Sequence, residues 1–279
     1  MNNKHRGIGL FFIIFLIIGL VFFRPRMMDE KKLAAEQSPI VPTLFLHGYK
    51  GSERSFSTML SRMEDQQWGE KALVCRVSKN GRISLKGILP ENTDNPFIQV
   101  IFENNRARIS DQTKWLQSVM KILKDRYNVQ EINFVGHSMG GLTLTSYLET
   151  TNGHEAYPKA LKLVTIGSPF KGIDQENYFD RNYGAALEDL KVGSSALNLL
   201  RTNKDFFPRN LPVLSIVGVI TDPSTGDGLV SQESALANGN IVKHDQFKGI
   251  ILKDPKATHF GLHEHKRVDQ LIAEFLWGK

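Results

Sequence analysis

The chain has 279 residues, of which 41% are apolar and 23% are charged, an ordinary composition for a globular protein. This length allows one or two domains with a substantial core, and the composition excludes a chain that is disordered throughout. The net charge is +6, but half of the excess lies in residues 1–39, so the basic pI of 9.3 does not indicate nucleic-acid binding.

The first predicted element is an apolar segment at residues 7–23, which carries no charge and has basic residues at both ends. A membrane-spanning helix needs about 20 residues, with a lower limit near 17, whereas a secretory signal is usually shorter. No cleavage site of small residues follows directly. We therefore expect an uncleaved signal-anchor at residues 1–24 and a polar linker at 25–39. The rest of a single-pass cell-membrane protein would then lie outside the cytoplasm, or be secreted if the segment is cleaved.

From residue 40 onward, short apolar runs alternate with helical patterns. Such continuous runs are typical of strands that are buried on both faces of a parallel sheet. We expect one helix to begin with Ser110 as its N-cap and another to end the chain. The alternation predicts a doubly wound, mostly parallel α/β domain over residues 40–279. The predicted strands lie at 41–46, 73–77, 131–135, 161–166 and 214–220.

Two stretches interrupt this alternation. Residues 78–104 contain Lys79-Asn80-Gly81, a hairpin turn signal, and predict a small antiparallel excursion. Residues 170–211 are long and polar, and they lie between two predicted strands, where a cap insert over a site could form. For both stretches an ordinary surface insertion is the alternative.

The segment Gly136-His137-Ser138-Met139-Gly140 contains the pattern Gly-x-Ser-x-Gly. The pattern alone arises by chance in about one chain in ten of this length. Here an apolar strand precedes it and an apolar helix follows it, which is the arrangement of a nucleophile elbow. The tight turn leaves no room for side chains two residues on either side, and it holds the hydroxyl beside a helix N-terminus. We therefore predict that Ser138 is a nucleophile.

A serine nucleophile needs a base, which an acid orients, in the chain order serine, acid, histidine. Asp227 is the preferred acid because Asp-Gly at a sharp turn can aim a carboxylate back at the site; Asp222 and Asp245 are alternatives. His259, shortly before the last helix, is the preferred base, with His263 as its rival. Asp227 and His259 lie in loops at the carboxyl edge of the predicted sheet, where a doubly wound fold places its site, whereas His263 is expected in the first turn of the last helix.

Two main-chain N–H groups are expected to stabilise the negative charge that develops on the substrate oxygen. One belongs to Met139, directly after the nucleophile, and the other to Tyr49 in the loop after the first strand. We expect His47 to brace this loop, with a role as base as the alternative.

The sequence predicts neither a metal nor a cofactor. His259, His263 and His265 lack the spacing of a zinc protease, and no phosphate-binding glycine loop is present. Cys75 is the single cysteine and lies in a predicted strand, so it predicts a buried thiol and not a nucleophile.

Several of these segments together resemble a family of bacterial α/β-hydrolases long catalogued as a domain of unknown function, with the elbow of lipases. The resemblance covers about residues 40–279, and it implies the α/β-hydrolase fold with Ser138, Asp227 and a histidine of the last motif as catalytic groups. It rests on Leu46-His47-Gly48-Tyr49, Asn95-Pro96-Phe97, residues 136–141, Gly167-Ser168-Pro169-Phe170, Asp227-Gly228-Leu229-Val230 and residues 259–264.

The expected activity is hydrolysis of a carboxylic ester, small or lipid-like, through an acyl-enzyme intermediate. Acyltransferase, thioesterase and peptidase activities use the same groups. A catalytically silent, membrane-anchored binding module is the alternative of another class. We expect contact with a membrane through the N-terminal helix and no nucleic-acid partner.

Overall fold

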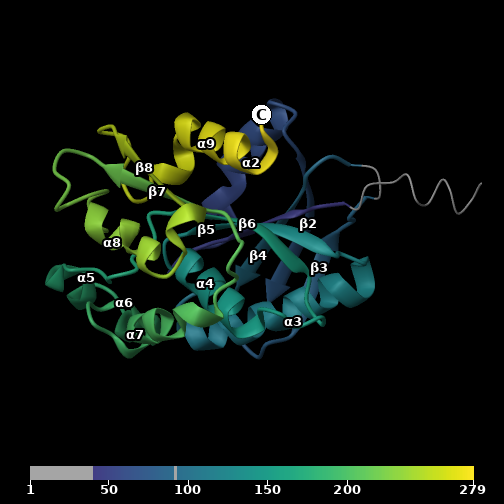
Figure 1. Ribbon diagram of the computed structural model, residues 1–279, viewed down its shortest axis with the longest axis horizontal. Helices are drawn as coiled ribbons and strands as arrows, with labels where there is room; N and C mark the ends of the chain where they lie inside the picture. Colours follow the sequence, from purple (N-terminus) through teal and green to yellow (C-terminus); the bar gives the residue numbers. More distant parts are fainter. Residues whose placement is uncertain (1–39, 91–92) are drawn as a thin grey trace, which may run out of the picture. The chain divides into compact units, whose positions relative to one another are not determined.

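An eight-stranded sheet forms the centre of the protein in a computed structural model that describes residues 40–90 and 93–279 (Figure 1). Its strand order is β3-β2-β4-β1-β5-β6-β7-β8, and only β3 runs antiparallel to its neighbour. The predicted, mostly parallel α/β sheet is thus confirmed. The strands are β1 (Thr43–Leu46), β2 (Glu70–Val77), β3 (Ile83–Gly87), β4 (Pro96–Phe102), β5 (Glu131–His137), β6 (Lys159–Ile166), β7 (Val213–Val219) and β8 (Phe247–Lys253).

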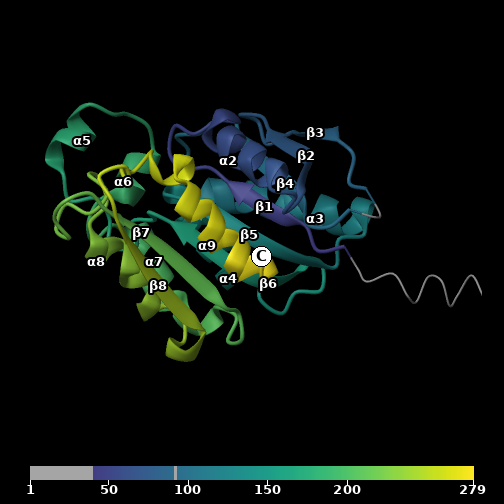
Figure 2. The same cartoon turned by 90° about the horizontal axis from the view of Figure 1, so that it is seen from above.

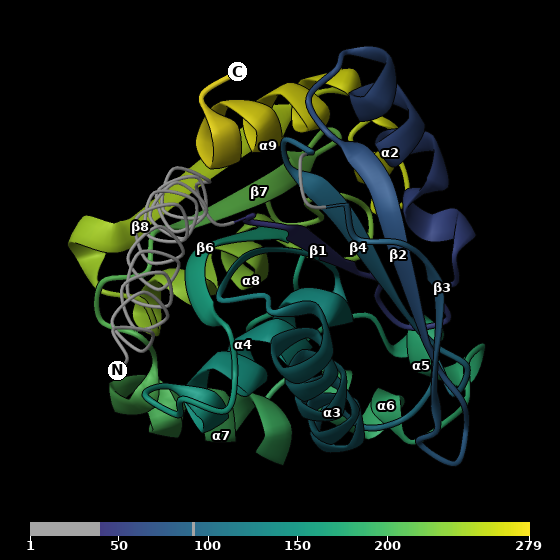
Figure 3. The same cartoon turned by 90° about the vertical axis from the view of Figure 1, so that its right-hand side faces the viewer.

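Helices cover both faces of the sheet (Figures 1 and 3). Figure 2 looks onto the face that α2 (Arg54–Asp65) and α9 (Lys266–Trp277) cover. The opposite face carries α3 (Ile109–Tyr127), α4 (Met139–Thr151) and α7 (Ser195–Thr202). The shorter elements are α5 (Glu176–Asp180), α6 (Ala186–Leu190), α8 (Gln232–Leu236) and the 3-10 turns η1 (Asn203–Phe206), η2 (Ala237–Asn240), η3 (His244–Gln246) and η4 (Leu262–Glu264).

Two hydrophobic cores lie on the two faces of the sheet, because successive side chains of a strand point to opposite faces. Phe45 of β1 packs in the core that α2 and α9 close, whereas Leu44 and Leu46 pack in the core beneath α3 and α4. All three side chains are fully buried. A strand buried on both faces explains why its sequence reads as a continuous apolar run.

The predicted antiparallel excursion at residues 78–104 is confirmed for the first part of this stretch and wrong for the last part. A turn at Lys79–Gly81 does join β2 to the antiparallel strand β3. The following strand β4, however, is a buried parallel strand between β2 and β1. Gln99 interrupts its apolar run: its Nε2 donates to the main-chain oxygen of Glu53 at 2.7 Å, whereas its Oε1 is buried without a hydrogen-bond partner among the described residues.

The predicted N-cap of α3 was also wrong. The helix begins at Ile109, and Arg108 occupies the cap position without a side-chain hydrogen bond. Asp189 takes over this function from another part of the chain: its Oδ2 accepts from the Ile109 N–H at 2.7 Å, and its Oδ1 accepts from Arg108 at 2.9 Å. A carboxylate at a helix N-terminus is favoured by the helix dipole.

The predicted signal-anchor at 1–24 and linker at 25–39 lie outside the described residues and stay predictions. Within residues 40–90 and 93–279, no helix is long and apolar enough to cross a membrane.

Candidate active site

Ser138 occupies a tight turn between β5 and α4, with φ 54° and ψ −127°. A positive φ is costly for a residue with a Cβ and persists only where the surroundings impose it. Gly136 and Gly140 make the turn possible. A Cβ on Gly136 would lie 2.6 Å from the Gly141 nitrogen, and one on Gly140 would lie 2.3 Å from the Leu46 oxygen. The strand-to-helix geometry expected of a nucleophile elbow is therefore present.

The structure brings Ser138, His259 and Asp227 together, although 121 residues separate the serine from the histidine. His259 Nε2 lies 2.9 Å from Ser138 Oγ, and its Nδ1 lies 2.8 Å from Asp227 Oδ2. Because a carboxylate can only accept, Nδ1 carries the proton toward Asp227, and in the neutral ring Nε2 accepts from the hydroxyl. The three side chains are buried, yet all three come from loops at the carboxyl edge of the sheet.

Main-chain donors hold the Asp227 carboxylate. Its Oδ1 accepts from the N–H groups of Leu229 and Val230, at 3.0 and 2.7 Å, which leaves Oδ2 for the imidazole. The main-chain oxygen of Asp227 also accepts from the His259 N–H at 2.8 Å. The acid and the base are thus joined twice, once through their side chains and once through their backbones, and this fixes the orientation of the imidazole.

The rival residues lie in other surroundings. Asp222 is exposed, and its Oδ1 accepts from the N–H and the hydroxyl of Ser224. Asp245 is exposed within η3. His263 has no hydrogen bond to Ser138; its Nδ1 lies 3.2 Å from Glu264 Oε1. The pKa of His263 is lowered, chiefly by burial.

His137 holds the main chain of the histidine loop. Its Nε2–H donates to the main-chain oxygen of His259 at 2.8 Å, and its ring centroid lies 4.8 Å from that of His259 and 5.0 Å from that of His263. Burial, followed by the two neighbouring imidazoles, lowers the pKa of His137 well below its usual value. The sequence did not predict a role for His137, because the second position of the Gly-x-Ser-x-Gly pattern accepts any residue.

The two expected main-chain donors belong to residues next to Ser138 or to its neighbour Gly48. Met139 is the first residue of α4, and Tyr49 follows Gly48, where an added Cβ would lie 3.2 Å from Ser138 Oγ. Neither N–H donates a hydrogen bond to another group within residues 40–90 and 93–279. Their role as donors to a substrate oxygen stays a prediction.

His47 connects this loop to β4. Its Nδ1–H donates to the Gly48 oxygen at 2.8 Å, and its Nε2 accepts from the Phe102 N–H at 3.0 Å. Burial lowers the pKa of His47 to about 4, which agrees with a neutral ring that donates at one nitrogen and accepts at the other. Both nitrogens are used by the main chain, so the ring serves as a brace for the loop.

A cavity of about 380 Å³ opens beside Ser138. Its walls include Tyr49 and Lys50 from the loop after β1, and Tyr178 and Asn182 from the stretch at 170–211. Only the part of that stretch around α5 borders the cavity, whereas α7 packs against α4. This volume is near the lower end of the range for small-molecule sites.

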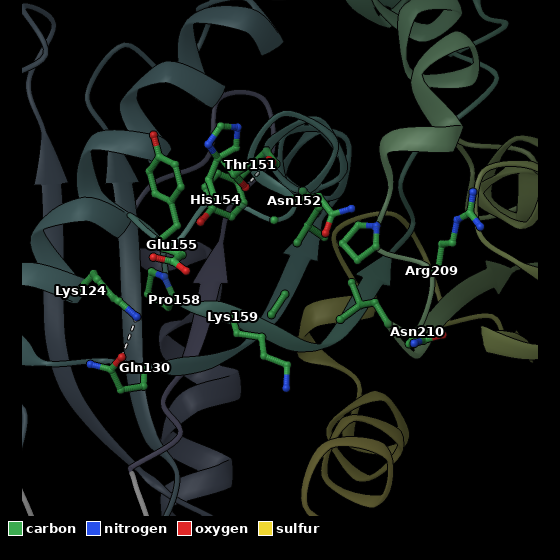
Figure 4. A pocket seen from close by; sticks show the side chains of 17 residues that line it. Lys124, Gln130, Thr151, Asn152, His154, Glu155, Pro158, Lys159, Arg209 and Asn210 are labelled. Carbon is green, nitrogen blue, oxygen red and sulfur yellow. Dashed lines mark hydrogen bonds between the residues drawn. The ribbon is translucent and has the colours of Figure 1, made fainter.

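A second cavity, of about 700 Å³, lies elsewhere, and none of the sequence-predicted site residues lines it. Figure 4 shows that Lys124 turns to Gln130, to which it donates a hydrogen bond of 2.6 Å. Lys159 and Arg209 point in different directions (Figure 4), so the charged side chains do not converge on one ligand position. We therefore place the candidate site in the smaller cavity.

No cluster of three or more metal-ligating side chains occurs among residues 40–90 and 93–279. The predicted position of Cys75 in a strand is confirmed: it lies buried in β2, and burial raises the pKa of its thiol to about 12. A thiol held in its protonated form is a poor nucleophile.

The profile described as "Alpha/beta hydrolase of unknown function (DUF915)" matches residues 30–279. The chain belongs to this family. The resemblance and the α/β-hydrolase fold predicted from the sequence are thereby confirmed.

Solved structures agree with this membership. A gene product from Listeria innocua is 30% identical, with a TM-score of 0.74 over 86% of this chain and 95% of its own. A candidate cell surface hydrolase from Lactobacillus plantarum is 25% identical, with a TM-score of 0.68 over 87% and 93%. A lipase from Bacillus licheniformis, 17% identical with a TM-score of 0.57 over 86% and 96%, shares the fold. A comparison with curated proteins found no match.

Proposed function

We propose that this protein is a serine hydrolase that cleaves carboxylic esters through an acyl-enzyme intermediate. The observation that carries the proposal is the position of His259, which contacts the Ser138 hydroxyl at 2.9 Å and the Asp227 carboxylate at 2.8 Å. The ester class is favoured because fold relatives are named as a lipase and a lipase-esterase related protein.

In the first half of the proposed reaction, Ser138 Oγ attacks the ester carbonyl carbon and its proton passes to His259 Nε2. The carbonyl oxygen becomes an oxyanion, which accepts from the N–H groups of Met139 and Tyr49. Asp227 stabilises the imidazolium that forms. His259 then gives the proton to the departing alkoxide, and the acyl group stays on Ser138.

In the second half, water takes the place of the alcohol. His259 accepts a proton from the water, whose oxygen attacks the acyl carbon. The second oxyanion collapses, Ser138 Oγ recovers its proton from His259, and the carboxylic acid leaves. An acyltransferase would replace the water with another acceptor, and a thioesterase or peptidase would change only the leaving group.

A fluorophosphonate probe tests the proposal on the full chain. We expect covalent labelling of the wild type and none of Ser138→Ala, together with release of p-nitrophenol from a panel of p-nitrophenyl esters of increasing acyl length. A folded wild-type protein that neither reacts with the probe nor hydrolyses any of these esters would instead support the silent binding module.

A further inference from the structure

The cavity beside Ser138 has an uneven distribution of charge. Of the residues that line it, Lys50 carries the only lysine or arginine charge, and no aspartate or glutamate is among them. The pKa values of His137 and His263 are lowered by burial, so these two rings add no charge near neutral pH. A substrate in this cavity therefore meets one ammonium group that no carboxylate of the wall offsets.

Contacts with neighbouring groups hold the ammonium of Lys50. The backbone of Lys50 has φ 60°, and its N–H donates to the Asn105 oxygen at 3.0 Å. Its Nζ donates to Asn182 Oδ1 at 2.7 Å and lies 5.7 Å from the centre of the Tyr49 ring. The Asn182 amide is itself held, because its Nδ2 donates to the Tyr178 oxygen at 2.7 Å. Since an ammonium has three donors, others remain for a substrate.

A second cation lies behind the same wall. The guanidinium of Arg106 lies 6.0 Å from the Tyr49 ring and 4.5 Å from the Tyr183 ring. Its Nε is buried without a hydrogen-bond partner among the described residues. The two cations therefore add to the positive potential on this side of the cavity.

We propose that Lys50 selects substrates that carry a negative charge, a carboxylate or a phosphate, close to the bond that is cleaved. The inference rests on the proposed function and names its substrate class. Lys50 acts here as a specificity-determining residue, because it attracts a distant part of the substrate and takes no part in the proton transfers. The charge can belong to the acyl part or to the alcohol part of the ester, and the experiment separates the two.

The test compares kcat/KM for two matched pairs of esters. The acyl pair is mono-p-nitrophenyl glutarate against p-nitrophenyl pentanoate, which have five-carbon acyl groups with and without a carboxylate. The alcohol pair is the butyrate ester of para-hydroxybenzoate against that of its methyl ester. The anionic-to-neutral ratio of the wild type is divided by that of each variant, so intrinsic reactivity cancels. Background rates come from Ser138→Ala.

We expect the anionic-to-neutral ratio of Lys50→Gln to be about 3- to 10-fold lower than that of the wild type in at least one pair, as for a partly exposed ion pair, and that of Lys50→Arg to be close to the wild-type ratio. Asn182→Asp places a carboxylate on the ammonium and should lower the ratio in the same pair. Added salt should weaken the wild-type preference. Lys191→Gln removes a lysine that does not line the cavity and should leave the ratio unchanged.

An unchanged ratio in both pairs for Lys50→Gln, with hydrolysis that depends on Ser138 intact, would overturn this inference and leave the proposed function standing. A folded wild type that hydrolyses none of the four esters and resists the fluorophosphonate would overturn the proposed function, and this inference with it. Melting temperatures of the variants control for folding.

Discussion

The Nε2–H of His137 donates to the main-chain oxygen of His259 at 2.8 Å, so the residue before the serine holds the loop that carries the imidazole. His263, at the other end of this loop, is held in a similar way, because Arg62 donates to its main-chain oxygen at 3.1 Å. Arg62 is in turn fixed by two hydrogen bonds to Asp269. The 2.9 Å contact between His259 and Ser138 therefore depends on residues on both sides of the loop.

Replacing His137 should test this positioning role. In His137→Phe the ring stays and the donor is lost, and we expect kcat to fall about 10- to 100-fold with little change in KM, because a small displacement of a catalytic group is costly. His137→Gln keeps a donor and should recover part of the loss. Ester kinetics and melting curves check this. Equal kcat values for the two variants would contradict a role that depends on the hydrogen bond.

The assignment of the base gives a second prediction. Ser138→Ala and His259→Ala should each lower kcat about four to six orders of magnitude, since triad residues act as a unit. His263→Ala is the matched control: its ring contacts His137 but makes no hydrogen bond to Ser138. We expect it to keep activity within about 10-fold of the wild type. A loss confined to His263→Ala would identify His263 as the base.

The acid gives a third prediction. Asp227→Asn keeps the shape of the side chain but lets the amide donate to His259, which disfavours the tautomer that can accept from Ser138. We expect kcat to fall about 10⁴-fold with folding retained. Asp222→Asn, at an exposed turn, should have little effect on kcat. If instead the two variants exchanged these outcomes, the acid would be Asp222.

Much of the fold and the candidate site could be predicted because their signals are local. The glycines that permit the turn at Ser138 lie within five residues of one another, and the strands buried on both faces appear as apolar runs. The sequence of strand β8 has no such run. The strand lies at the edge of the sheet, where Lys248 is exposed. Edge strands often carry charged side chains, because these prevent pairing with the strand of another molecule.

Contacts between distant segments could not be predicted in this way. The hydrogen bond from Lys50 to Asn182 joins residues 132 positions apart, and Asp189 caps a helix that begins 80 residues earlier. The sequence around each of these residues gives no sign of its partner, because each residue by itself is typical of a surface or of a helix. Only the folded chain places the partners together.

The last prediction concerns the pH dependence of stability. Glu149 is a buried residue of α4, and its Oε1 has no hydrogen-bond partner within the described residues. Burial raises its pKa from 4.5 to about 8. The folded protein therefore binds this proton more tightly than the unfolded chain does. The protonation of Glu149 therefore contributes to the free energy of unfolding. This contribution is present in full below pH 4.5 and is lost as the pH rises through 8, with a magnitude on the order of a few kcal/mol.

Glu149→Gln removes this titration, since an amide of similar shape carries no charge at any pH. We expect the variant to unfold at a higher denaturant concentration than the wild type at pH 8 to 9, and the advantage to shrink toward pH 5. Glu155→Gln, in an exposed loop, is the control and should follow the wild-type curve. Parallel stability curves for Glu149→Gln and the wild type across this range would mean that Glu149 is ionised in the folded protein, with a partner or water that satisfies its charge.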